Sequence, residues 1–153
     1  MRVLRSIDRE PAGPAHRAAL SLYRIVLGLL FACHGASSLF GILGGNLGKG
    51  GTISAASFPD GTAALIELVT GVLVLAGLVP RAAALLASGT MAYAYFTVHQ
   101  PKSLWPIENG GEQAALFCWG FLMVALFGAG DWTLPALLRQ AGLPIGARAE
   151  ESA

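Results

Sequence analysis

The sequence predicts an all-α fold, an integral membrane four-helix bundle with both termini in the cytoplasm. Hydrophobic residues make up 54% of the 153 residues and charged residues only 12%, a balance outside the usual range of water-soluble domains. Four long apolar segments follow one another along the chain, and most charged residues lie before, between or after them. These observations place the protein in the cell membrane as a multi-pass chain.

A helix that crosses a bilayer needs roughly 20 mostly apolar residues, because the hydrocarbon core is about 30 Å thick. Four segments approach that length, at about residues 20–43, 62–79, 82–100 and 112–130. They form one predicted domain, residues 20–130, between a basic tail at 1–19 and a second tail at 131–153. The first segment starts too late and is too long for a secretory signal peptide, so we expect it to remain as a membrane anchor.

Orientation follows from Lys and Arg, which collect on the cytoplasmic side of membrane proteins. Pro80 and Arg81 form a tight turn that makes the second and third segments antiparallel neighbours. One side of the bundle then holds Arg2, Arg5, Arg9, Arg17, Arg81, Arg139 and Arg148, and the other holds Lys49 and Lys102. Both tails are therefore predicted to be cytoplasmic.

Composition also limits the classes of partner that we expect the protein to bind. The formal net charge is +1 and the basic residues form no concentrated basic face or block, which argues against nucleic-acid binding. The expected partners are the lipid bilayer and other membrane or redox proteins. Cys33 and Cys118 lie in apolar runs without metal-type or C-x-x-C spacing, so we interpret them as buried thiols and predict no metal site.

Ionisable residues within membrane segments are costly, and each is a candidate for function. Here they are His34, Glu67, His99 and Glu112. At 1.5 Å per residue, Glu67 lies roughly 8 Å and His34 roughly 13 Å below the outer surface, with the other two near it. All four fall in the outer half, away from the cytoplasm, where one polar pocket could collect them.

Each polar residue also has a simpler interpretation. Tyr95 and His99 share an inward-facing stripe with Ser88 and Ala92. Asn109 and Glu112 fit a helix capping box, and His34 could hydrogen-bond to Glu67 as glue between helices. Arg24 lies one turn inside the first segment, where its side chain could reach back to the headgroups, and we treat Arg24 and Arg81 as structural polar residues.

Several short motifs together resemble the DoxX family of small membrane proteins over roughly residues 20–134. In chain order the motifs are Tyr23-Arg24-Ile25-Val26-Leu27-Gly28, Cys33-His34-Gly35, Glu67-Leu68-Val69-Thr70-Gly71, Gly77-Leu78-Val79-Pro80-Arg81, Asn109-Gly110-Gly111-Glu112 and Gly128-Ala129-Gly130-Asp131-Trp132-Thr133-Leu134. The resemblance implies a four-helix membrane domain and a link to membrane redox chemistry. That chemistry includes quinone reduction during thiosulfate oxidation, and complexes that act in thiol or oxidative stress. The family often has a lysine after the His-Gly pair, where this chain has Ala36-Ser37-Ser38-Leu39.

Three functional hypotheses follow, and the sequence does not say whether the protein is an enzyme. In the first, a redox-associated subunit binds a quinone or a similar apolar ligand in the outer half, with His34, Glu67, Tyr95, His99, Asn109 and Glu112 as contacts. In the second, the chain is a non-enzymatic structural or assembly subunit of a larger membrane complex. In the third, His34 and His99 ligate a haem, which is disfavoured because they lie roughly 10 Å apart along the membrane normal.

Overall fold

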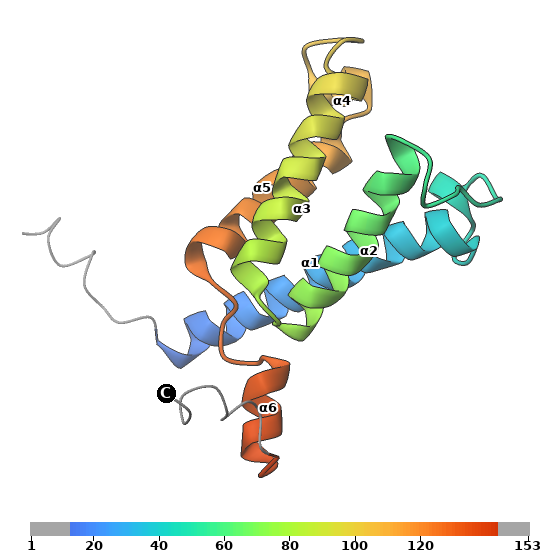
Figure 1. Cartoon of the computed structure of the whole chain (residues 1–153). Coiled ribbons are helices and arrows are strands. Elements are labelled where there is room, and N and C mark those ends of the chain that lie inside the picture. Colours follow the sequence, from blue (N-terminus) through green and yellow to red (C-terminus); the bar gives the residue numbers. More distant parts are fainter. Residues whose placement is uncertain (1–12, 144–153) are drawn as a thin grey trace, which may run out of the picture.

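The computed structural model describes residues 13–143, and every regular element within them is helical (Figure 1). The prediction of an all-α fold is thereby confirmed for this part of the chain. In order, the elements are α1 (Pro14–Phe40), a 3-10 turn η2 (Asn46–Gly48), α2 (Asp60–Ala76), α3 (Pro80–Ala94), a π-helical turn η3 (Tyr95–His99), α4 (Pro106–Asn109), α5 (Glu112–Phe127) and α6 (Leu134–Gln140). Arg2, Arg5, Arg9 and Arg148, used above for orientation, lie outside the described residues.

Proline and glycine set the helix ends. Pro14 and Pro80 stand at the first positions of α1 and α3, where a missing amide hydrogen costs nothing. Gly41 and Gly77 follow α1 and α2 with φ of 70° and 71°, the left-handed conformation that closes a helix and that glycine adopts without strain. The turn from Gly77 to Pro80 therefore reverses the chain between α2 and α3.

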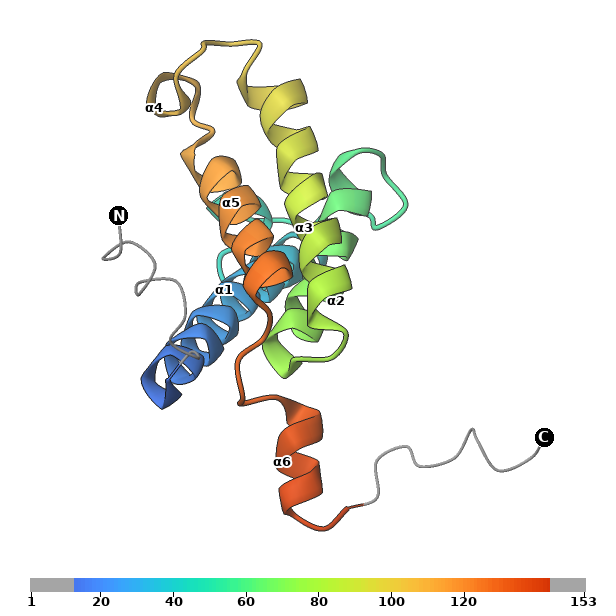
Figure 2. The ribbon, with the colours of Figure 1, turned by 90° about the vertical axis from the view of Figure 1, so that its left-hand side faces the viewer.

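Each of the four predicted segments contains a helix, but the predicted bounds need correction. The first helix begins at Pro14 and not near residue 20, and the fourth ends at Phe127 and not at 130. The third changes at Tyr95 from α-helical to π-helical geometry. Part of the predicted C-terminal tail forms the short helix α6, which lies apart from the long helices (Figures 1 and 2).

By length and composition, α1 is the one described helix that could cross a membrane unaided. Helix α5 is apolar but has 16 residues. The structure thus supports one spanning helix directly.

The long helices pack as two pairs that diverge from the turn at Pro80 (Figure 1). Helix α1 packs along α2, and α3 packs along α5. In the first pair the backbones nearly touch: a Cβ atom on Gly71 would lie 2.5 Å from the Ala32 nitrogen, and one on Gly35 would meet Ala64 and Leu68 equally closely. Small residues thus allow the close approach of α1 and α2.

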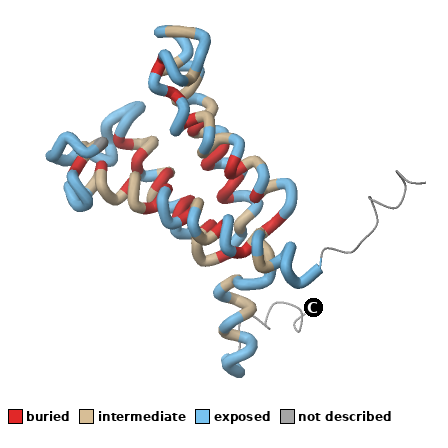
Figure 3. Tube along the Cα trace, turned by 180° about the vertical axis from the view of Figure 1, so that it is seen from behind, coloured by how far each residue is buried: buried red, intermediate tan, exposed pale blue. Residues whose placement is uncertain are grey.

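The buried residues follow the inner faces of the helices, and exposed residues cover the outside (Figure 3). Phe31 of α1 lies at the centre, with its ring centroid 4.6 Å from that of Phe121 and 5.1 Å from that of Phe117 on α5. Large apolar side chains also face outward, among them Leu116 and Trp119 of α5 and Leu29 of α1. An exterior so rich in apolar side chains suits contact with lipid.

Candidate functional site

His34 and Glu67 meet between α1 and α2. His34 Nδ1 lies 2.9 Å from Glu67 Oε2, and the side chains are 28% and 8% exposed. The close approach at Gly35 and Gly71 brings the two helices near enough for this contact. A neutral imidazole that donates from Nδ1 to the carboxylate keeps Nε2 as an acceptor, so Glu67 sets both the orientation and the tautomer of His34.

His34 also lines a cavity of about 410 Å³. Its other lining residues are Leu30, Cys33 and Ser37 of α1, Leu43 and Gly48 of the following loop, and Gln113 of α5. The volume lies within the roughly 300–1,000 Å³ of small-molecule pockets. A histidine held by a carboxylate therefore faces a space that contains a thiol, a hydroxyl and a carboxamide.

A second polar cluster closes the connection from α3 to α5. His99 Nδ1 lies 3.2 Å from the Asn109 carbonyl oxygen, and Tyr95 stacks on His99 with ring centroids 6.5 Å apart. Asn109 is buried; its side-chain nitrogen donates to the Ser103 carbonyl and its side-chain oxygen accepts from the Gly111 amide. These bonds hold the loop between the two helices.

The structure thus divides the six predicted contact residues instead of collecting them in one pocket. His34 lines the 410 Å³ cavity and Glu67 supports it from behind. Tyr95, His99 and Asn109 belong to the second cluster and do not line that cavity. His34 bonds to Glu67 and His99 bonds to the Asn109 carbonyl oxygen, so the two histidines belong to different clusters.

The predicted capping box at Asn109 and Glu112 is wrong. Gly111 is the residue before α5 and makes no side-chain cap, while Glu112 is the first helical residue and is exposed. Asn109 bonds to the Gly111 amide within the turn before the helix. A carboxylate in the first turn still favours α5 through the helix dipole.

Arg24 is fully buried, with 0% of its surface exposed. It donates to four backbone carbonyls: those of Val74 and Leu75 near the end of α2, and those of Ala129 and Trp132 after α5. Its side chain is therefore bonded inside the protein and is not exposed on the surface. It caps the C-terminus of α2 and fastens the chain after α5 to α1.

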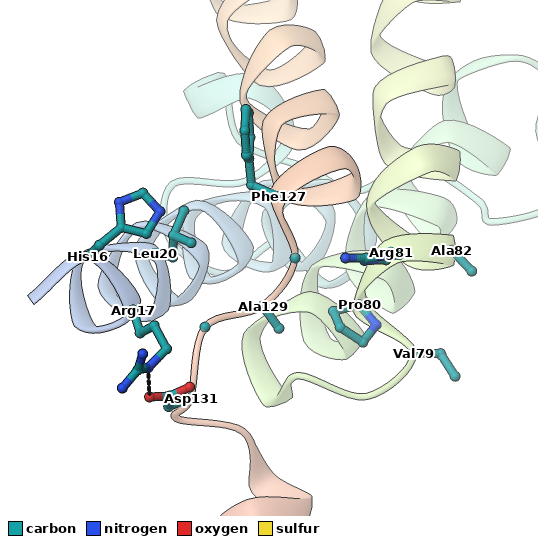
Figure 4. Close-up of a pocket in the computed structure, with 12 residues that line it drawn as sticks. His16, Arg17, Leu20, Val79, Pro80, Arg81, Ala82, Phe127, Ala129 and Asp131 are labelled. Carbon is teal, nitrogen blue, oxygen red and sulfur yellow. Dashed lines mark hydrogen bonds and ion pairs between the residues drawn. The ribbon is translucent and has the colours of Figure 1, made fainter. Parts of the chain in front are cut away.

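Arg81 lies at the start of α3 and is exposed. It lines a second cavity together with the start of α1 and the segment that follows α5 (Figure 4). Across this cavity Arg17 and Asp131 form an ion pair of 2.8 Å, drawn as a dashed line in Figure 4.

Sequence reasoning missed the other polar residues beside His34. Cys33 was interpreted as a buried thiol, but both cysteines are half-buried and Cys33 lines the cavity. Leu30, Cys33, His34 and Ser37 stand at i, i+3, i+4 and i+7, so they share one helix face. That spacing in the sequence could have indicated that these side chains lie beside His34. No group of three metal-ligating side chains occurs in residues 13–143.

Comparison with known proteins gives two matches. The family model described as DoxX matches residues 19–100, which include most of α1, all of α2 and α3, and the π-helical turn with His99. An uncharacterized protein of Haemophilus influenzae is 36% identical over 122 residues, which cover 75% of this chain and 87% of that protein. No solved structure matches.

Proposed function

The chain belongs to the DoxX family of membrane proteins, and we propose that it crosses the membrane several times. We further propose that it binds a quinone, or a similar apolar ligand with a polar head, beside His34. The observation that carries the proposal is the bond between His34 and Glu67 at the edge of a ligand-sized cavity. Its biological role is that of a redox-associated membrane subunit.

The proposed topology has four spans. Helix α2 has 17 residues and α5 has 16, so they are about 26 Å and 24 Å long, and the stretch from Pro80 to His99 is about 30 Å. The shorter two approach the hydrocarbon thickness of about 30 Å, and modest thinning of the bilayer accommodates such a mismatch. Arg17 and Arg81 at one end, and Lys49 and Lys102 in the opposite loops, favour cytoplasmic termini.

His34 suits a quinone head because a quinone exchanges protons when its redox state changes. Glu67 orients the imidazole, and Nε2 makes no hydrogen bond within residues 13–143. Nε2 would accept from a quinol hydroxyl when the ring is neutral and donate to a quinone carbonyl oxygen when the ring is protonated. Ser37 and Gln113 would supply further polar contacts from the cavity wall, while Leu30 and Leu43 would contact apolar parts of the ligand. A bound quinone would supply the redox chemistry.

A direct test is to purify the full-length protein from its native membrane in mild detergent and quantify co-purifying quinone by mass spectrometry. We expect quinone in the wild type and at least about tenfold less after His34→Leu, because the hydrogen bond between the imidazole and the quinone oxygen is lost. Glu67→Gln should also reduce it, since the amide cannot fix the imidazole through a charge. His99→Gln is the matched control, because His99 belongs to the second cluster.

A second candidate, a structural or assembly subunit, is favoured by a different observation. Within the described residues every buried side-chain nitrogen and oxygen has a hydrogen-bond partner, so the polar groups need no ligand to be satisfied. An apolar groove of about 690 Å³ between α2 and α3, lined by residues such as Leu85, Leu86 and Tyr93, offers room for a partner helix. Stable protein partners without quinone, and wild-type behaviour of Glu67→Gln, would support this candidate and overturn the first.

A further inference from the structure

A large cavity at the opposite end of α1 from His34 has no role in the proposed quinone site. It measures about 780 Å³ and forms where the start of α1, the turn before α3 and the segment after α5 meet (Figure 4). Its polar lining residues are His16, Arg17, Arg81 and Asp131. The cavity therefore joins three parts of the chain and contains two guanidinium groups and one carboxylate.

Among the described residues that line this cavity, the arginines outnumber the carboxylates. Asp131 is already paired with Arg17 at 2.8 Å. Arg81 makes no hydrogen bond or ion pair within residues 13–143, although its side chain points toward the segment after α5 (Figure 4). A Cβ atom on Gly128 would lie 3.5 Å from Arg81 Nη2, an ordinary contact distance, so the guanidinium lies close to this segment. Within the described part of the chain, Arg81 is therefore a cation without a counter-charge, at the positive end of α3.

An apolar groove continues from this cavity. It measures about 340 Å³ and runs between α1 and α5 along Ala19, Tyr23, Met123 and Val124. The two spaces share four lining residues, His16, Leu20, Phe127 and Gly128. A ligand that filled both would carry an anionic group at one end and a hydrocarbon chain at the other.

We propose that this combined site binds an anionic phospholipid, with the headgroup phosphate at Arg81 and an acyl chain in the groove between α1 and α5. A soluble phosphate would use the cation but leave the groove empty, and a zwitterionic lipid would fill the groove but bring a second cation close to Arg81. Under the proposed topology the site lies at the cytoplasmic leaflet, where anionic lipids attract Arg and Lys. Its occupancy does not depend on quinone binding at His34.

The test is native mass spectrometry of the full-length protein in detergent, with equal amounts of phosphatidylglycerol and phosphatidylcholine that have identical acyl chains. We expect preferential retention of phosphatidylglycerol by the wild type. Arg81→Gln should lower that retention about fivefold, since one basic side chain near the headgroup is lost. Phe127→Ala should lower the retention of both lipids, because Phe127 lines the groove and, being exposed, contributes little to the fold.

Two control variants test whether the lipid binds at this site and not elsewhere on the protein. Arg139→Gln removes an exposed arginine of α6 that lines neither space and should leave retention unchanged. His34→Leu should also leave it unchanged, which separates this site from the quinone site. Equal retention of the two lipids, wild-type retention by Arg81→Gln, or displacement of the lipid by millimolar glycerol 3-phosphate would each overturn the proposal.

Discussion

Arg24 shows how a charged side chain is accommodated inside this protein without an acidic partner. Its guanidinium donates to four backbone carbonyls, two of them in the last turn of α2. Carbonyls at the end of a helix lack intrahelical partners and carry the negative end of the helix dipole. One side chain therefore bonds carbonyls at the end of α2 and after α5, and it joins three parts of the chain.

Replacing Arg24 should destabilise the protein strongly. Arg24→Met keeps much of the side-chain volume but leaves the carbonyls of Leu75, Ala129 and Trp132 without a donor among the described residues, so we expect a loss of roughly 3 kcal/mol or more. Thermal unfolding in detergent, followed by tryptophan fluorescence, measures the change. Arg139→Gln, at an exposed position of α6, should shift the midpoint little, and an equally small shift for Arg24→Met would contradict the assigned role.

The contrast between His34 and Arg24 shows what sequence can predict at this scale. The His34–Glu67 bond could be expected because each side chain is rare in a membrane segment and their estimated depths were similar. The partners of Arg24 are main-chain carbonyls, which every residue has. No pattern in the sequence points to them, so the burial of Arg24 became visible only in the fold.

Among the helices, the α1–α2 pair depends on glycine at the contact. A Cβ atom on Gly28 would lie 2.6 Å from the Leu75 nitrogen, and one on Gly71 would lie 2.9 Å from the Gly28 carbonyl oxygen. Both neighbours are backbone atoms, which cannot move aside as a flexible side chain can. The separation of these helices therefore also fixes the distance between His34 and Glu67.

Gly71→Ala should push α1 and α2 apart. We expect a loss of roughly 1–3 kcal/mol, the usual cost of overpacking, together with weaker quinone retention because the His34–Glu67 contact is strained. Gly89→Ala is the matched control, since Gly89 lies within α3 and nothing stands within 4 Å of its added methyl group. That variant should be unchanged or stabilised by up to about 1 kcal/mol. Similar unfolding midpoints for both variants would contradict the packing account.

The sequence predicted the number of long helices correctly, but it predicted their ends less accurately. Long apolar runs identify four helices because burial or lipid contact requires them. The π-helical turn at Tyr95, the start of α5 at Glu112 and the short α6 depend on tertiary contacts and turn geometry. Asn109, for example, bonds to the Gly111 amide in a turn, an arrangement that shares its sequence signature with a helix cap.

At the scale of the whole molecule, the two proposed binding sites lie at opposite ends of α1. The cavity beside His34 lies near the loop that follows α1, and the cationic cavity lies at the start of α1. The second polar cluster, around His99, belongs to the α3–α5 pair. Depth estimates from the sequence placed His34, Glu67, His99 and Glu112 in the outer half of the bundle, but depth carries no information about which pair of helices a residue faces.

The proposed topology makes a prediction for chemical labelling. In a chain with Cys33→Ser and Cys118→Ala, cysteine at Lys49 or Lys102 should react with a membrane-impermeant maleimide added to intact cells. Cysteine at Arg139 should react only after the membrane is opened or inverted. Labelling of Arg139→Cys from outside, or protection of either loop variant, would contradict cytoplasmic termini with four spans.

Calorimetric titration of the purified full-length protein in detergent with a short-tail benzoquinone tests whether a quinone binds at His34. We expect saturable binding by the wild type and by His99→Gln, and at least about tenfold weaker binding by His34→Leu, because a hydrogen bond to the quinone is lost. Equal binding by wild type and His34→Leu, or equal weakening by His99→Gln, would contradict a quinone site at His34.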